Sequence, residues 1–133
     1  MLINFSFHHL GYATNSIEKT VVLFQLMGYV PSEKVTDTIQ NVNIVLLSHK
    51  NSPFIELVEP IGDNSPVVNI IRKNGVTPYH ICYEVEDINK AIYYLRKQGF
   101  ISIFNPVPAV VFGNRLICYL YNKNIGLIEL VNI

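Results

Sequence analysis

Two histidines and two glutamates stand at matching places in the two halves of this sequence, and their side chains are suited to binding a metal ion. His9 and His80 each open an alternating run, and Glu56 and Glu129 each lie between aliphatic residues. A carboxylate on an apolar strand face is costly unless it is paired or coordinates a metal. Two imidazoles and two carboxylates would bind a divalent first-row metal and leave two octahedral positions for substrate or water.

A single strand residue of either kind has a simpler explanation. A strand glutamate is most often on a solvent face, and a lone strand histidine most often makes an ordinary hydrogen bond. The recurrence of both types at matched positions favours the four-residue metal site. His8, whose counterpart is Tyr79, and His49, at a turn, are expected to be solvated surface residues.

The match between the halves extends well beyond these four residues. The segment FHHLGYATNSIEKTVVLFQLMGY at 7–29 aligns without a gap with PYHICYEVEDINKAIYYLRKQGF at 78–100, and the tetrapeptide at 55–58 recurs identically at 128–131. A unit this long that occurs only twice is not a solenoid repeat. The sequence therefore indicates an internal duplication of one module.

Each module predicts the same succession of elements. Strand-like alternation is followed by a polar cap, at Asn15-Ser16 or Asp87, and then by helical spacing that ends at Gly28 or Gly99. Three strand-like runs complete each module: 32–38, 41–49 and 54–59 in the first, and 101–105, 114–121 and 126–132 in the second.

The predicted fold class is α+β, with two tandem β-α-β-β-β modules in one domain over residues 1–133. Module one spans about 5–60, a linker helix spans about 65–75 with Pro66 at its first position, and module two spans about 77–133. If the modules pack about a pseudo-twofold axis, they form a curved mixed sheet around a central metal site.

Composition excludes several classes of protein. Ten basic residues balance ten acidic ones, which argues against a nucleic-acid binder, and half of the residues are hydrophobic, which argues against disorder. No apolar run is long enough to span a membrane. Cys82 and Cys118 lie in apolar alternating runs and are expected to be buried thiols, so we expect a cytoplasmic protein.

These residues resemble the vicinal oxygen chelate superfamily, which contains glyoxalase I, extradiol dioxygenases and bleomycin resistance proteins. The resemblance is strongest to methylmalonyl-CoA epimerases, and it is carried by the segments IELVEPIGDNSP at 55–66, YHICYEVEDI at 79–88 and GLIELV at 126–131. It implies that His9, Glu56, His80 and Glu129 bind a divalent cobalt, nickel, manganese or zinc ion. It also implies proton transfer next to a thioester through a metal-stabilised enolate, with Glu129 as the base and Glu56 as the next candidate.

The sequence departs from those epimerases at several places. Ile44 stands where some of them carry a second catalytic carboxylate, and Arg115 is the one arginine expected in the substrate pocket. An apolar segment, 106–113, replaces a glycine-rich one and is expected to form a lid over the pocket.

Three functions are therefore considered. The leading hypothesis is a metal-dependent epimerase acting on an acyl-CoA. The alternatives are a glyoxalase I-like lactoylglutathione lyase acting on a thiol hemithioacetal, and a non-catalytic protein that binds or sequesters a small molecule. Related proteins often form dimers, so a homodimer is expected.

Overall fold

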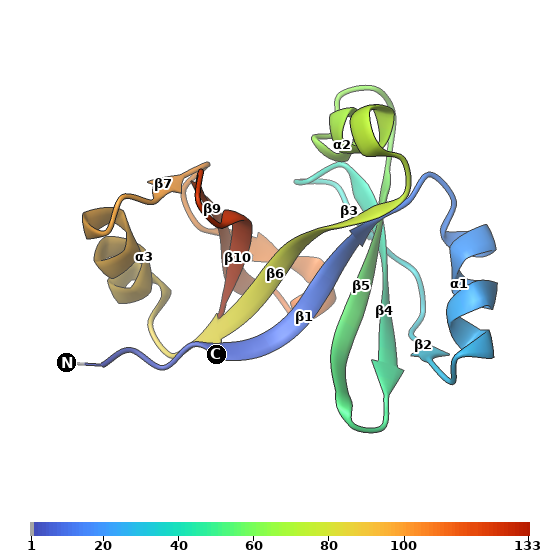
Figure 1. Cartoon of the computed structure of the whole chain (residues 1–133), viewed down its shortest axis with the longest axis horizontal. Coiled ribbons are helices and arrows are strands. Elements are labelled where there is room, and N and C mark those ends of the chain that lie inside the picture. The colour runs from blue at the N-terminus through green and yellow to red at the C-terminus, as the bar shows by residue number, and fades with distance from the viewer. Residues whose placement is uncertain (1) are drawn as a thin grey trace. The chain divides into compact units, whose positions relative to one another are not determined.

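The computed structural model describes residues 2–133, which form an α+β fold (Figure 1). The chain divides into two compact units. One contains His9–Tyr79, and the other contains the residues up to His8 together with His80–Ile133. The boundaries fall inside two strands, β1 (Ser6–Ala13) and β6 (Thr77–Val85), so each strand contributes to both units. Among the described residues, no helix has the length and apolar character needed to cross a membrane.

The unit of residues 9–79 contains a mixed sheet in the order β2-β4-β5-β1, with β3 also paired to β4. Strand β5 runs parallel to β1 and antiparallel to β4. Its elements after β1 are α1 (Ile17–Leu26), β2 (Val30–Pro31), β3 (Val35–Asp37), β4 (Val42–His49), β5 (Ser52–Pro60) and α2 (Val67–Asn74).

The other unit repeats this topology, with strands in the order β6-β10-β9-β7 and β8 paired to β9. Strand β10 runs parallel to β6 and antiparallel to β9. Its elements after β6 are α3 (Ile88–Lys97), β7 (Ile101–Ser102), β8 (Val107–Ala109), a short 3-10 helix (Val110–Phe112), β9 (Arg115–Asn122) and β10 (Gly126–Asn132). The two halves therefore share one strand order, as a repeated module predicts.

The bounds of the strand expected over 32–38 are wrong: within that range only residues 35–37 form a strand, β3, and a separate short strand, β2 at residues 30–31, precedes it. Ser32 lies between them and accounts for the break. Its backbone N–H donates to the Leu46 carbonyl (2.8 Å), but its side-chain Oγ accepts from the Leu46 N–H (2.9 Å). A hydroxyl thus takes the place of the backbone carbonyl that a continuous ladder would use.

Both long helices begin and end where the sequence predicts. The Ser16 side chain accepts from the Lys19 N–H at the start of α1, and the Asp87 side chain accepts from the Lys90 N–H at the start of α3. After each helix a glycine adopts a positive φ (93° at Gly28 and 95° at Gly99), a conformation that favours glycine.

A second contact ties each helix to the end of its own sheet. The backbone N–H of Ile17, the first residue of α1, donates to Glu59 Oε2 at the end of β5 (2.9 Å). The backbone N–H of Ile88, the first residue of α3, donates to Asn132 Oδ1 at the end of β10 (2.7 Å). The last strand of each half therefore satisfies an N–H that the helix itself cannot.

The hydrophobic core of each unit lies between its helix and one face of its strands. Under α1 the buried core residues are Ile17, Val45, Leu47 and Leu57. Under α3 they are Val85, Ile88, Ala91, Ile92, Cys118, Leu120, Ile128 and Leu130. Because side chains alternate along a strand, the residues between these core positions point to the opposite face of the sheet. That face carries the candidate functional residues.

Cys82 and Cys118 are both free and buried, as the sequence predicts. Burial raises the pKa of the Cys118 thiol from 9.0 to about 11. Between these two pH values the Cys118 thiol therefore stays protonated in the folded state but loses its proton in the unfolded chain. We expect unfolding free energy to fall between about pH 9 and pH 11, by an amount on the order of 2 kcal/mol.

Urea unfolding at pH 8 and pH 10.5, compared between the natural protein and Cys118→Ala, measures this effect. The substitution removes the thiol, so its unfolding free energy should depend less on pH over that interval. Equal pH dependence in the two proteins would contradict the expectation.

Candidate functional site

The first histidine and glutamate come together within the unit of residues 9–79. His9 lies in β1 and Glu56 in the neighbouring parallel strand β5, where Glu56 is in register with Gly11. The neighbours of Glu56 in sequence, Ile55 and Leu57, pack toward α1, so Glu56 points to the other face. His9 Nε2 and Glu56 Oε1 are 3.4 Å apart, and both side chains are buried.

The second pair repeats this arrangement in the other unit. His80 lies in β6 and Glu129 in the parallel strand β10, where Glu129 is in register with Cys82. Ile128 and Leu130 pack toward α3, so Glu129 also points away from the helix. His80 Nε2 and Glu129 Oε1 are 3.0 Å apart, and both side chains are buried.

The geometry of each pair fits two ligands of one metal ion. Ligand atoms at about 2.1 Å from a common ion lie roughly 3.0 Å apart in octahedral geometry and roughly 3.4 Å apart in tetrahedral geometry. The observed separations are 3.0 Å and 3.4 Å, and the atoms are an imidazole nitrogen and a carboxylate oxygen in both pairs. All four residues are thus candidate metal ligands by atom type and by spacing within their own unit.

The two glutamates differ in their neighbours on the third strand. In the antiparallel pairing of β4 with β5, Glu56 faces Leu46. In the equivalent pairing of β9 with β10, Glu129 faces Tyr119. The Tyr119 ring also meets the His80 ring edge to face, with centroids 5.2 Å apart. No motif in the sequence points to Tyr119, although the alignment of the two halves matches it with Leu46.

The two residues expected in a substrate pocket have distinct surroundings. Ile44 is a buried residue of β4, in register with Val58. Arg115 begins β9, and its Nη1 donates to Glu84 Oε2 at 2.7 Å, with both side chains about one-third exposed. The charge of Arg115 is therefore balanced by a carboxylate of the same unit. A role for either residue in substrate binding stays a prediction.

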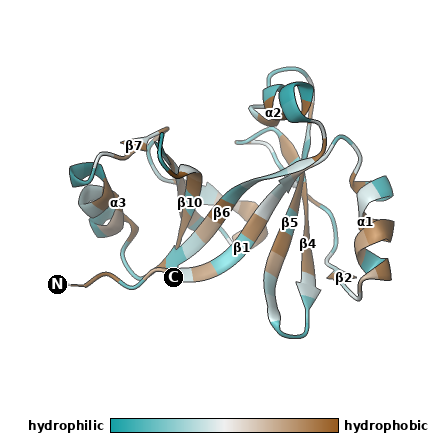
Figure 2. Cartoon of the chain, viewed as in Figure 1, coloured by the Kyte–Doolittle hydropathy of each residue, from teal (hydrophilic) through white to brown (hydrophobic). Residues whose placement is uncertain are grey.

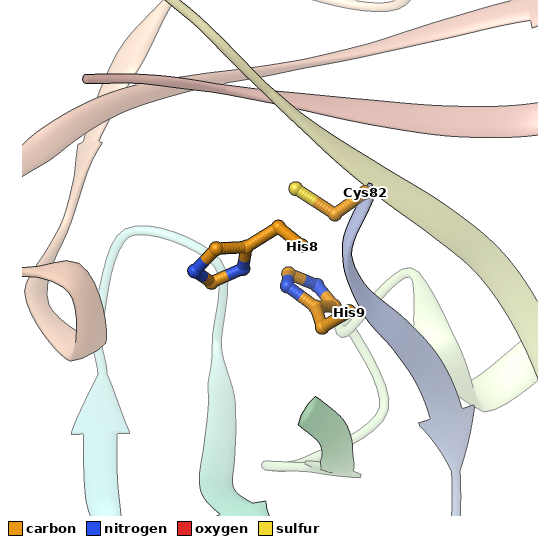
Figure 3. A group of neighbouring side chains, drawn as sticks. All are labelled: His8, His9 and Cys82. Atoms are coloured by element: carbon orange, nitrogen blue, oxygen red, sulfur yellow. The ribbon is translucent and has the colours of Figure 1, made fainter. Parts of the chain in front are cut away.

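His8 and His49 are half-buried rather than solvated, so that expectation is wrong for both. The His8 ring packs edge to face against Phe112, with centroids 5.2 Å apart, and the His49 ring packs against Tyr29. Figure 3 shows His8 with Cys82 of the same unit, whose ligand atoms lie within 4.8 Å of each other. The His8 ring thus packs against Phe112 and lies near the Cys82 thiol.

The segment expected to form an apolar lid contains regular structure. Residues 107–109 form the strand β8 at the edge of β9, and residues 110–112 form the 3-10 helix that follows. Pro108 is tolerated there because an edge strand can leave its outward side without a backbone donor. Ala109 and Phe112 are buried, which fixes this segment against its own unit.

Comparison with known proteins gives one family and a consistent set of relatives. Residues 8–119 match the model of the glyoxalase/bleomycin resistance protein/dioxygenase superfamily. The chain is 31% identical over 129 residues to the mitochondrial methylmalonyl-CoA epimerase of Dictyostelium discoideum, covering 92% of this chain and 75% of the relative. It is 31% identical over 127 residues to the mitochondrial methylmalonyl-CoA epimerase of Homo sapiens, covering 92% and 71%.

Solved structures show the same fold. Methylmalonyl-CoA epimerase from Mycobacterium tuberculosis superposes with a TM-score of 0.85 at 21% identity, covering 96% of this chain and 87% of that one. A variant of the Streptomyces coelicolor epimerase in complex with 2-nitronate-propionyl-CoA superposes with a TM-score of 0.86 at 22% identity, covering 97% and 95%.

Proposed function

Because this chain belongs to the glyoxalase/bleomycin resistance protein/dioxygenase superfamily, we propose that it is an isomerase of the methylmalonyl-CoA epimerase type. Its substrate would be a 2-substituted acyl-CoA, whose epimers differ at the carbon next to the thioester. The observation that carries this proposal is the buried His–Glu pair that recurs in both halves. A buried acid–base pair is a costly feature that proton-transfer chemistry can use.

The same proposal includes one divalent metal ion held by His9, Glu56, His80 and Glu129 in a single working domain. Each pair has the ligand types and the spacing that cobalt, nickel, manganese or zinc accepts. When bound, such an ion supplies a Lewis acid that polarises a carbonyl oxygen and so acidifies the adjacent C–H bond.

Glu129 is proposed to remove the proton from the carbon next to the thioester. Its carboxylate is buried beside the His80 imidazole, which holds it in one orientation. Burial excludes the water that would otherwise compete for the carboxylate oxygens. Glu56 has an equivalent imidazole partner and is the second candidate for this role.

The lyase alternative receives no support from the relatives named above, which are epimerases. Its substrate also demands cationic side chains for the carboxylates of glutathione. Arg115, the arginine expected to serve there, is paired with Glu84. The isomerase is therefore the function we put forward.

Deuterium incorporation tests the proposed function directly. The metal-loaded protein is incubated with methylmalonyl-CoA in deuterium oxide, and exchange at the 2-carbon is followed by NMR against a protein-free blank. We expect exchange well above the blank, and its loss in His80→Ala. A protein that binds the thioester and metal at stoichiometry without exchange would instead be a non-catalytic binder.

We also propose a homodimer, and the surface of α1 supports it. The outward residues of α1 and the following turn are large and apolar, and Leu26 is 83% exposed. Figure 2 shows brown, hydrophobic turns on α1, whereas the equivalent helix α3 carries teal, hydrophilic segments beside its brown ones. The exposed apolar residues of this patch are Val22, Leu23, Leu26, Met27 and Val30. An uncharged patch is complementary to its own copy, so an isologous contact can bury it.

Placing a charge in this patch should dissociate the dimer. At the position of Leu26 the equivalent helix carries Lys97, so Leu26→Lys keeps a residue that the module tolerates. We expect analytical ultracentrifugation to give a dimer for the natural protein and a shift of at least tenfold in its dissociation constant for Leu26→Lys. Tyr94→Lys on α3 is the matched control, and a natural protein that is monomeric at 100 μM contradicts the proposal.

A further inference from the structure

We propose that the Tyr119 hydroxyl is the second proton-transfer group of this site, acting on the face of the substrate carbon that Glu129 does not serve. The inference rests on the proposed epimerase function. Epimerisation removes a proton from one face of a carbon and delivers a proton to the other, so it needs two groups that exchange protons. Glu129 supplies one of them.

The two halves of the molecule differ in the residue that faces each glutamate across the antiparallel strand pair. Glu56 faces Leu46 across the antiparallel pair β5/β4, whereas Glu129 faces Tyr119 across the equivalent pair β10/β9. Duplicated modules thus give a carboxylate beside an aliphatic side chain in one half and a carboxylate beside a phenol in the other. Ile44, two positions before Leu46, is also aliphatic. The environments of the two glutamates therefore differ in one polar group, the Tyr119 hydroxyl, which lies only on the strand beside Glu129.

Tyr119 and Glu129 share one face of their sheet. Their neighbours in sequence, Cys118, Leu120, Ile128 and Leu130, form the core under α3, so the two side chains project to the opposite face. Directly opposed residues of antiparallel strands have Cβ atoms about 5 Å apart. A carbon flanked by two oxygens at about 3 Å each needs them about 6 Å apart, which such a pair of long side chains can provide.

Aromatic packing restricts the Tyr119 ring. It meets the His80 ring at 84° with centroids 5.2 Å apart, and it meets the Phe104 ring with centroids 5.7 Å apart. Two edge-to-face contacts favour one ring orientation. The residue is half-buried, so part of its side chain is exposed to solvent.

The proposed steps balance without a further reagent. The Glu129 carboxylate takes the proton as the C–H bond breaks, and the electron pair remains on the substrate as an enolate. The Tyr119 O–H bond then breaks, its proton forms the new C–H bond on the opposite face, and a phenolate remains. The proton held by Glu129 returns to the phenolate through the neighbouring side chains or one water molecule, which restores both groups.

The test separates exchange from inversion. Each epimer of methylmalonyl-CoA is incubated separately with metal-loaded protein in deuterium oxide. NMR measures exchange, and a coupled enzyme specific for one epimer measures inversion. In Tyr119→Phe, which keeps both ring contacts, we expect inversion to fall about a hundredfold or more. The epimer whose proton faces Glu129 should still exchange within about threefold of the natural rate, with retention of configuration.

Tyr121→Phe is the matched control, because it removes one hydroxyl from the same strand at an exposed position. It should leave inversion unchanged, and metal content should be equal in all three proteins. Inversion by Tyr119→Phe within threefold of the natural rate overturns this inference alone. An equal fall in exchange and inversion also overturns it, because that result indicates a structural role. No exchange by the natural protein overturns the proposed function and this inference together.

Discussion

Replacing Glu129 by glutamine is expected to lower the rate of exchange at the 2-carbon about a thousandfold. Glutamine keeps the size of the side chain and one oxygen, but it cannot accept the proton that glutamate removes. Loss of a positioned general base costs two to four orders of magnitude in rate. The measurement is the initial rate of deuterium incorporation into methylmalonyl-CoA at saturating substrate, for protein with matched metal content.

The duplication supplies the control for this experiment. Glu56→Gln removes the same charge from the other half, where the glutamate also lies beside a histidine at 3.4 Å. A base at Glu129 predicts a much smaller loss of rate, about tenfold or less, in Glu56→Gln. A larger loss in Glu56→Gln than in Glu129→Gln would reverse the assigned roles.

Binding of a divalent ion is expected to raise the melting temperature of the natural protein by about 10 °C. A ligand present at 100 to 1,000 times its dissociation constant stabilises the folded state by about 3 to 4 kcal/mol. For a domain of this size each 1 kcal/mol shifts the melting temperature by about 3 °C. The expected stabilisation arises because the ion neutralises two buried carboxylates, Glu56 and Glu129.

Calorimetry with cobalt, nickel, manganese and zinc in turn, before and after a chelator, measures this shift. His9→Ala and His80→Ala each remove one proposed ligand, so both should lose most of the stabilisation by the metal. His49→Gln changes a histidine that packs against Tyr29 and should keep it. A full metal-dependent shift in either alanine variant would remove that histidine from the ligand set.

The sequence predicted the elements whose signals are local. Ser16 and Asp87 cap the helices as expected, because a short polar side chain before an apolar helical run has few other uses. The residues of the pairs His9–Glu56 and His80–Glu129 could also be predicted from the sequence, since the same residue types recur in equivalent strands of the two halves. Because the two halves can be aligned with each other, residues that recur at equivalent positions can be identified from this one sequence.

Contacts between strands that the duplication does not repeat could not be predicted from the sequence. The break at Ser32 depends on a hydroxyl reaching the Leu46 N–H, and alternation within 32–38 carries no trace of it. The pairing of Arg115 with Glu84 joins residues 31 positions apart. In the sequence Tyr119 is one of several strand aromatics, and only the strand register shows that it faces Glu129.

The contacts that end each half have a consequence for folding. The first N–H of α1 is bonded by Glu59, 42 residues later, and the first N–H of α3 by Asn132, 44 residues later. Each helix therefore reaches its native hydrogen bonding only after the last strand of its own module has paired. Closing a loop of this length costs conformational entropy before the contacts at its ends form. The helix and the sheet of each module are therefore expected to form as one cooperative unit. We expect hydrogen exchange to protect the start of each helix and the end of its last strand together, as two separate units within one chain.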